Sequence, residues 1–543
     1  MTSIIKFEER DIKFDDDSVK VNKYNPIFEQ FSEEYKSDTL ILNYDVVIKS
    51  LRGDKDSYNR FKGYTEEKKE VPIFIKFCPL VDPIKIMVGK IEGSDFSLPK
   101  LNDSSHEFSD KNNSAFVDGF FSYLTSKLKN KYGFINGLDC YGSFLSIKKN
   151  FRVDILDDIE YLFESNHFME NKDKFNISES IYEHFQPTQS CKFKKKLNIK
   201  ASMDLDIDIL DIDEIDDDTI LLPSIDQTNA VHDLVYTNDI RQLSRSSKSG
   251  SSCSSRSSTT TIESDYTLSD VDSDLELDSD EDSRSSSIYS CEEESIIAEL
   301  EEMPTNMVLL EDCKDTLDDY IMNNKISEDE WSSILMQIVI SLSVFQEKFY
   351  FIHNDLHSSN VMYVETDKQY LYYKYNNLYY KVPTYGKVWK IIDFGRGIYK
   401  LNGHVIFSDS FSDKGDASTQ YNCEPYLNAN KQIVPPNFSF DLCRLACSLY
   451  DYFEEENDLD NIKRLIETWL TDYKGRNILY KKNGDERYED FKLYKMISRT
   501  VHDHVPKKQL SNKLFSQYLV SRKNIKKKMN LVMNIDDIPD LTV

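Results

Sequence analysis

The sequence predicts an α+β fold that is interrupted by a long segment of a different composition. Short apolar runs typical of strands occur at 39–50, 71–77, 134–161 and 307–311. Stretches with helical periodicity dominate after residue 316. Between these parts, residues 201–300 contain 26 Asp/Glu and five Lys/Arg, which is a net charge of −21 out of −28 for the chain.

The acidic segment is predicted to be a disordered insertion at residues 201–302. It begins with alternating Asp and Ile/Leu, passes through a Ser-rich stretch at 244–261 and ends in Asp/Ser/Glu repeats. Such a composition buries too little apolar surface to offset the entropy of ordering the chain. Its portion 204–222 could instead pair as a strand or bind a partner. A folded domain tolerates such an insertion because closure entropy grows slowly with loop length.

The cysteines and the start of the chain indicate a soluble protein in a reducing compartment. The nine cysteines include no C-x-x-C pair, and no apolar run approaches the length of a membrane span. Residues 1–20 are charged and lack the apolar core of a secretion signal. We therefore expect a cytoplasmic protein, or a virion component if the chain is viral, with no membrane partner.

The first folded part is predicted at residues 38–200, after a polar N-terminal extension at 1–37. Its strand at 71–77 carries a single lysine, Lys76, which lies on the same strand face as Cys78. A lysine among apolar neighbours needs a partner, because burial of its charge alone is costly. A surface position on an edge strand is the alternative.

An amphipathic helix is predicted at 113–131. Its apolar stripe consists of Val117, Phe120, Phe121, Leu124 and Leu128. Asp118 is the only acid inside the striped part, and the region 134–161 that follows is predicted to form strands with glycine turns.

The second folded part is predicted at 303–505, followed by a basic tail at 506–543. It starts with the strand that ends at Glu311. A capping box at 327–330 then opens a long helix with a buried stripe that reaches residue 349.

Two polar motifs follow the long helix. Residues 353–360 match H-x-D-L-x-x-x-N through His353, Asp355 and Asn360, and an apolar strand further on delivers Asp393 into a Phe-Gly turn. As ordinary structural residues, these would be turn formers and a capping acid. Two such motifs in this order are much less expected by chance than either motif alone.

The combined pattern resembles the eukaryotic-like protein kinase superfamily and, more narrowly, the serine/threonine kinases encoded by large DNA viruses. The narrower similarity is carried by the segments 74–77, 79–83, 141–144, 353–357 and 393–397. It covers roughly 40–200 and 305–505. The resemblance implies a small β-rich N-lobe, a larger helical C-lobe and ATP bound between them.

The resemblance also implies roles for the motif residues. Asp355 would be the catalytic base in the loop that begins at His353, and Asn360 and Asp393 would hold magnesium. Asp441, at the start of a C-lobe helix, would accept hydrogen bonds from the loop backbone; a plain helix N-cap is its alternative.

On the N-lobe side, Lys76 would reach the α- and β-phosphates and pair with an acid of the 113–131 helix. Asp118 is the candidate acid, with Glu92 and Glu107 as alternatives. Glu311 is a further candidate for contact with the nucleotide.

The sequence departs from the kinase pattern in four ways. No G-x-G-x-x-G precedes Lys76, Asn354 stands where Arg is usual, His357 stands where Lys is usual, and no A-P-E occurs. The leading hypothesis is a kinase that phosphorylates Ser/Thr of proteins, including its own 204–300, with no nucleic-acid partner. A small-molecule phosphotransferase of the same fold and a pseudokinase scaffold are the alternatives.

Overall fold

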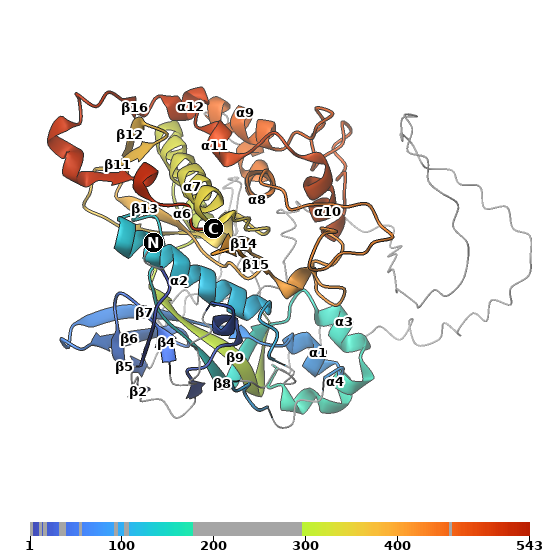
Figure 1. Cartoon of the computed structure of the whole chain (residues 1–543). Coiled ribbons are helices and arrows are strands. Elements are labelled where there is room, and N and C mark those ends of the chain that lie inside the picture. Colours follow the sequence, from blue (N-terminus) through green and yellow to red (C-terminus); the bar gives the residue numbers. More distant parts are fainter. Residues whose placement is uncertain are drawn as a thin grey trace, which may run out of the picture. The chain divides into compact units, whose positions relative to one another are not determined.

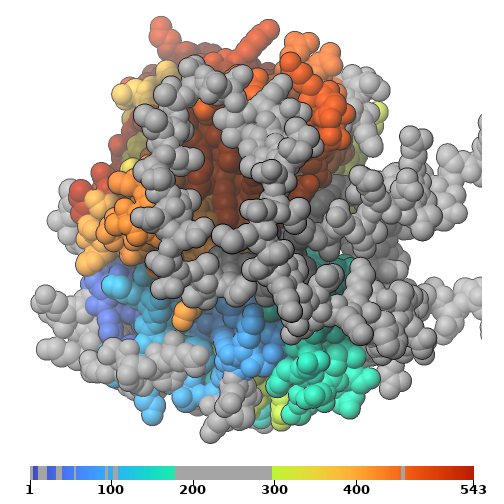
Figure 2. Space-filling view, turned by 90° about the vertical axis from the view of Figure 1, so that its right-hand side faces the viewer, coloured from blue at the N-terminus to red at the C-terminus, as the bar shows by residue number. Residues whose placement is uncertain are grey.

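The structure is a computed structural model with mixed α/β architecture (Figure 1). It describes residues 4–9, 13–14, 19–31, 40–53, 57–91, 96–101, 108–177, 296–455 and 459–543. Residues 201–295 of the predicted disordered insertion lie outside these ranges. In Figure 2 the blue and green residues gather at the lower end of the face, and the orange and red residues gather at the upper end.

A curled seven-stranded sheet organises the first part of the chain. Its order is β2 (Lys13–Phe14), β5 (Ile48–Gly53), β6 (Arg60–Thr65), β7 (Glu70–Pro79), β9 (Ile297–Glu311), β8 (Cys140–Asp154) and β3 (Val19–Asn22). All neighbours are antiparallel except β2 and β5, which are parallel. The predicted strand at 71–77 is therefore a central strand, flanked by β6 and β9, and not an edge strand.

Helix α2 (Ser114–Tyr132) packs against β8 and β9, as predicted from its apolar stripe. The side chain of Asn113 caps its first turn by accepting the Ala115 N–H, and Gly133 ends it in the left-handed conformation that glycine adopts without strain. A Cβ at Gly119 would lie 2.7 Å from Asn306 Nδ2 and 2.8 Å from Ser143 Oγ. The missing side chain at Gly119 therefore lets α2 approach the sheet closely.

The N-terminal residues are part of the sheet, which corrects the prediction of an extension at 1–37. Strand β1 (Phe7–Glu9) pairs with β4 (Leu40–Leu42), while β2 and β3 form the two edges of the large sheet. The run at 39–50 is not one strand, because β4 ends at Leu42 and β5 begins at Ile48.

Two further boundaries differ from the prediction. The region 134–161 contains one long strand, β8, in which Gly142 makes no turn; a Cβ there would lie 2.3 Å from the Phe144 ring. Strand β9 begins at Ile297, so residues 297–302 belong to the sheet and not to the insertion. Ala298 and Leu300 are buried while Glu301 is exposed, which is the period of two of a strand within an acidic stretch.

Helices dominate the second part of the chain. They are α6 (Leu317–Asn323), α7 (Glu328–Phe349), α8 (Phe440–Glu455), α9 (Asp460–Trp469), α10 (Phe491–Thr500), α11 (Pro506–Gln509) and α12 (Lys513–Ser516). The side chain of Ser327 caps α7 by accepting the Glu330 N–H, as the capping-box pattern predicts. Helix α7 is buried along nearly its whole length.

The C-terminal residues are folded onto a tyrosine-rich hairpin, which corrects the prediction of a separate tail at 506–543. Strands β16 (Leu519–Val520) and β17 (Val532–Asn534) flank the hairpin of β12 (Leu378–Pro383) and β11 (Tyr370–Tyr375). Asp536 accepts the N–H groups of Asn376 and Asn377 in the hairpin turn at 2.7 and 2.9 Å. Both asparagines have positive φ, which Asn tolerates better than most residues.

The remaining elements are short. They are α1 (Pro83–Met87), α3 (Ile159–Glu164), α4 (Asn166–Asn171), β10 (Val361–Glu365), β13 (Lys387–Ile391), β14 (Ile398–Leu401), β15 (His404–Phe407), and the 3-10 turns η1 (Pro26–Gln30), η2 (Lys172–Lys174), η4 (Ser358–Asn360), η5 (Asp409–Phe411), η6 (Lys526–Leu531) and η7 (Ile535–Asp537). Antiparallel β10 and β13 join the two polar motifs, because Asn360 precedes β10 and Asp393 follows β13.

Candidate functional site

Lys76 lies at the meeting point of three segments that are distant in sequence. Its Nζ lies 2.8 Å from Asp118 Oδ2 of α2 and 2.8 Å from Asp393 Oδ1, and its side chain is only 6% exposed. Although burial disfavours the ammonium group, the two carboxylates raise the pKa of Lys76 above its ordinary value. The lysine therefore stays charged and has the partner that its burial requires.

Asp118 is the acid that the structure brings to Lys76. Its second oxygen, Oδ1, accepts the Phe394 N–H at 2.7 Å, so one carboxylate links β7 to the Asp-Phe-Gly turn. The short Asp reaches the lysine because Gly119 lets α2 lie close to the sheet. The alternatives Glu92 and Glu107 lie outside the described residues.

Asp441, the second residue of α8, anchors the loop at 353–360 by accepting two hydrogen bonds from its backbone. The Asp441 carboxylate accepts the His353 N–H at 3.0 Å and the Asn354 N–H at 2.9 Å. Burial raises the pKa of Asp441 to about 6, and the backbone hydrogen bonds oppose this effect. Asn354 has a φ of 65°, a left-handed conformation in which Asn is enriched.

His353 connects the loop to the strand that delivers Asp393. Its Nε2 donates to the Ile392 carbonyl at 2.8 Å, and its Nδ1 accepts the Asp355 N–H at 3.3 Å. These roles require the neutral Nε2–H tautomer. With both ring nitrogens engaged, His353 positions the neighbouring residues.

Asn360 lies beside Asp393. Its backbone carbonyl accepts the Ile392 N–H at 3.0 Å, and its Nδ2 donates to the Asp355 carbonyl at 2.9 Å and to His357 Nε2 at 3.0 Å. Burial lowers the pKa of His357 to about 4, so this ring is neutral at pH 7 and brings no cation to the site.

Asp393 and Asn360 carry side-chain oxygen atoms of the kind that magnesium prefers. Within the described ranges, no group of three or more His, Cys, Asp or Glu side chains has metal-binding geometry. Mg²⁺ prefers oxygen ligands and is commonly held by one or two carboxylates together with water and phosphates. The Asp393 carboxylate and the Asn360 amide oxygen provide such a donor set.

Three side chains surround the Asp355 carboxylate, and none of them was a site residue predicted from the sequence. The Tyr494 hydroxyl donates to Asp355 Oδ1 at 2.9 Å, Arg444 Nε lies 4.0 Å from the same oxygen, and an Arg396 nitrogen lies 3.8 Å from Oδ2. The sequence positions of two of them could have indicated that they lie near the site. Arg396 follows the Asp-Phe-Gly motif directly, and Arg444 lies one helical turn after Asp441. The sequence position of Tyr494, on α10, gave no such indication.

Glu311 lies in an ion network, not among the groups around Lys76. Its carboxylate pairs with Lys129 at 2.9 Å and with the buried Lys390 at 2.8 Å, and it accepts the Asp139 N–H at 3.2 Å. Burial would raise the pKa of Glu311, but the two lysines lower it to about 2. This side chain ties β9 to α2 and β13.

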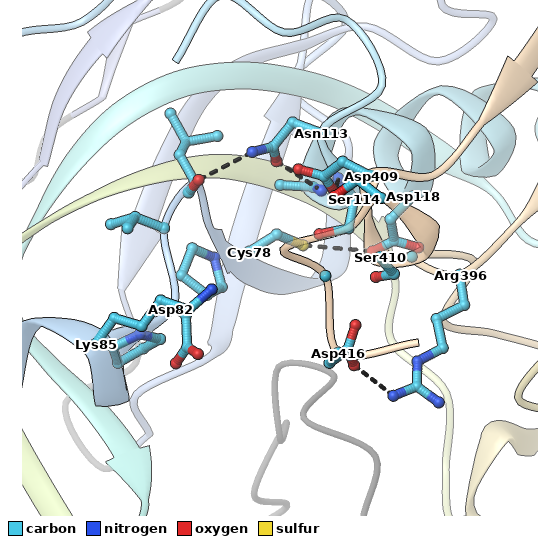
Figure 3. A pocket seen from close by; sticks show the side chains of 18 of the residues that line it. Cys78, Asp82, Lys85, Asn113, Ser114, Asp118, Arg396, Asp409, Ser410 and Asp416 are labelled. Atoms are coloured by element: carbon cyan, nitrogen blue, oxygen red, sulfur yellow. Dashed lines mark hydrogen bonds and ion pairs between the residues drawn. The ribbon is translucent and has the colours of Figure 1, made fainter. Parts of the chain in front are cut away.

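A pocket of about 270 Å³ opens beside Lys76, Asp118 and Asp393 (Figure 3). Figure 3 shows Ser114 and Asp409 close to Asp118 on one side, with the bonded pair of Arg396 and Asp416 on another. The other lining segments are 78–85, 113–115 and 409–416. The pocket therefore lies between the first turn of α2 and the segment after Gly395.

No protein-family model matches the chain. A segment of 113 residues, 20% of this chain, is 33% identical to an uncharacterized protein of Invertebrate iridescent virus 6 and covers 19% of that protein. A segment of 107 residues, 18% of this chain, is 33% identical to a probable serine/threonine-protein kinase of Dictyostelium discoideum and covers 9% of it. The chain thus spans less than a fifth of the length of these relatives, and the second match is a distant link to a kinase.

Among the residues that the structure describes, no helix is both long and apolar enough to cross a bilayer.

Proposed function

We propose that this chain is an ATP-dependent protein kinase that phosphorylates Ser/Thr hydroxyls. The observation that carries the proposal is the placement of Lys76 Nζ 2.8 Å from both Asp118 and Asp393. A strand lysine, a helix acid and the Asp of Asp-Phe-Gly are the parts that position nucleotide phosphates and metal in kinases. The partial match to a probable kinase supports the same class.

In this proposal the large sheet with α2 is the smaller lobe, and α6 to α12 belong to the larger lobe. ATP would bind between them, with Lys76 at its α- and β-phosphates and with Asn360 and Asp393 as magnesium ligands. Bound magnesium would neutralise charge on the phosphates. The connection at 54–56, where a glycine-rich loop would be expected, lies outside the described residues.

The chemistry of the chain's own residues is positioning and proton transfer. Asp355 accepts the proton of the acceptor hydroxyl as the acceptor oxygen bonds to the γ-phosphorus, and the bond from that phosphorus to the bridging oxygen of ADP breaks. Asp441 and His353 hold the backbone around Asp355 in place. Because His357 is neutral, Arg396 and Arg444 are the nearest cations to this base.

A small-molecule phosphotransferase of the same fold is the second candidate. Two observations favour it: the D-L-H-x-x-N pattern at His357, and the burial of the Asp355 side chain, which is 3% exposed. Such a base is more easily reached by a small acceptor than by a folded protein surface. A pseudokinase scaffold would require that the Lys76 cluster bind nucleotide without transfer.

The proposed substrates, partners and location follow from the sequence. Proteins bearing Ser/Thr are the proposed substrates, with residues 204–300 of this chain among them, and the cytoplasm is the proposed location. Neither nucleic acid nor membrane is proposed as a partner.

The decisive experiment is a panel of acceptors with labelled ATP and Mg²⁺. Dephosphorylated casein, a peptide of residues 241–262, choline and an aminoglycoside cover the candidate classes. We expect transfer to the proteinaceous acceptors and at least a hundredfold loss in Asp393→Asn, because the amide replaces the carboxylate that would hold magnesium. Exposed Asp367→Asn is the matched control and should retain full activity.

Each other outcome has a defined meaning. Transfer to choline or the aminoglycoside alone would establish the second candidate, and nucleotide binding without any transfer would establish the scaffold. Undiminished turnover in folded Asp393→Asn, with folding judged by circular dichroism, would refute the assigned site.

A further inference from the structure

The hydroxyl group of Tyr494 is hydrogen-bonded to the proposed catalytic base. It donates to Asp355 Oδ1 at 2.9 Å and accepts from Arg444 Nε at 2.8 Å. The rings of Phe440 and Phe491 pack on the tyrosine ring with centroid distances of 5.9 and 5.4 Å. Burial raises the pKa of Tyr494, so the phenol remains protonated and is the donor in its bond to the carboxylate.

This contact is the one that a phosphate acceptor would need to make. A general base must lie about 2.6–3.2 Å from the oxygen whose proton it accepts. The Tyr494 oxygen already lies at such a distance, and the Asp355 side chain is 3% exposed. An acceptor hydroxyl that reaches the same carboxylate oxygen therefore competes with the phenol.

We propose that Tyr494 occupies the acceptor position at Asp355, so that an acceptor must displace it before transfer. The inference rests on the proposed function, because it assigns Asp355 the role of base. It makes Tyr494 a determinant of acceptor choice: a hydroxyl on a slender, flexible segment displaces the phenol more readily than one on a rigid surface.

The surroundings of α10 provide a route for this displacement. Asp490, before the first residue of α10, has a φ of 47° and gives the helix no side-chain cap. At the other end, Arg499 donates to the Thr419 carbonyl at 2.8 Å, and Ser498 Oγ donates to the Gln420 carbonyl at 3.0 Å. Movement of α10 is therefore coupled to the segment that follows Gly395, beside which an acceptor would bind.

The test compares Tyr494→Phe with wild type in full-length protein, with dephosphorylated casein as acceptor. Removal of the hydroxyl removes the competitor while the ring still fills its site. We expect the KM for casein to fall at least threefold, with kcat not lowered and with the Kd for Mg·ATP unchanged. Tyr473→Phe, which removes an exposed phenol, is the matched control and should leave all three constants as in wild type.

A second variant, Tyr494→Leu, removes the bulk of the ring in case the ring itself blocks the acceptor. A lower casein KM in either variant, with kcat not lowered in Tyr494→Phe, supports the proposal. It is overturned if neither variant lowers the KM, or if kcat falls in Tyr494→Phe, which would make Tyr494 a positioning residue for the base. Asp393→Asn, assayed in parallel, distinguishes a failure of the Tyr494 proposal from a failure of the proposed function. If wild type and Asp393→Asn transfer phosphate equally or not at all, the proposed function itself has failed.

Discussion

At the scale of single residues, the charges around the proposed base are arranged differently from the kinase pattern. The position two residues after Asp355 holds a neutral histidine, His357, whose pKa is lowered to about 4 by burial. Positive charge comes instead from Arg396 and Arg444, at 3.8 and 4.0 Å from the carboxylate. Because an arginine stays protonated at any physiological pH, the positive charge beside Asp355 does not change near neutrality.

Burial also raises the pKa of a carboxyl that lines the pocket, Asp409. Asp409 accepts the Ser114 N–H at the first turn of α2, and burial raises its pKa to about 7; Asp110 and Asp416 add to the effect, and Lys85 opposes it. A raised folded-state pKa gives stability that is present below the unfolded value near 3.8 and is lost as pH rises through 7.

We predict that Asp409→Asn flattens this pH dependence. Wild type should lose about 2 kcal/mol of unfolding free energy between pH 5 and pH 7 from this group, and the variant should not, because an amide accepts the same bond without a charge. Urea unfolding at the two pH values gives the comparison. If the unfolding free energy changes equally with pH in both proteins, Asp409 ionises normally.

Several site residues were predictable because their signals are local. Asp118 stood out as the only acid in an apolar stripe, and Asp355, Asn360 and Asp393 stood in motifs with fixed spacing. Tyr494 was not predictable, since it meets Asp355 from 139 residues away through the packing of α10. The pairing of Glu311 with Lys129 and Lys390 was not predictable either, because it joins three elements that are far apart in the sequence.

At the scale of elements, the segment from Arg396 to Tyr421 is anchored without phosphate. The Tyr421 hydroxyl donates to Asn354 Oδ1 at 2.6 Å, and Arg499 donates to the carbonyls of Thr419 and Gln420. Phe407, Phe411 and Tyr421 of this segment also form an apolar cluster with Val434, which lies beyond it. The neutral Asn354 thus ties this segment to the 353–360 loop by hydrogen bonding, without a charge.

We predict that activity does not require phosphorylation within 396–440. Ser408 and Tyr421 are buried, and Asn354 offers no charge to a phosphate on the segment. Ser412→Ala, Ser418→Ala and Thr419→Ala should each keep at least half of the wild-type rate of transfer to casein. Phosphatase-treated enzyme, with loss of modification in this segment verified by mass spectrometry, should be equally active; an inactive treated enzyme would contradict the prediction.

The helices could be predicted far better than the short strands. Helices α2 and α7 carry their periodicity and caps within about 20 contiguous residues, so local pattern suffices. Strands such as β3 and β17 have four and three residues, and their partners are β8 and β11. Pairing over such sequence distances leaves no local signal, which is why both ends of the chain were mistaken for extensions.

At the scale of the whole molecule, two neighbouring strands bracket the acidic insertion. Strands β8 and β9 pair antiparallel, with Asp154 opposite Ile297, and Phe175 accepts the Glu299 N–H at 2.9 Å. Both ends of the intervening stretch are therefore held close together by the sheet.

Two deletions, each closed with the same short Gly/Ser linker, test where the insertion ends. Deletion of 204–295 should preserve the melting temperature and transfer to casein, because the shorter loop changes closure entropy by only about 1 kcal/mol. Deletion of 204–300 removes five more residues, including the buried Ala298 and Leu300. It should lower the melting temperature by about 5 °C or more, because burial of a leucine side chain alone contributes about 1.5–3 kcal/mol.

The pair of deletions is informative because the two proteins share everything but the start of β9. The longer deletion also removes the ion pair of Arg152 with Glu299 at 3.0 Å. It therefore destabilises the end of the sheet and leaves the Lys76 cluster in place. We therefore expect both proteins to keep the same Kd for Mg·ATP while differing in melting temperature. Equal melting temperatures would show that residues 296–300 belong to the insertion after all, and an unfolded shorter deletion would show that part of 204–295 is needed for the sheet.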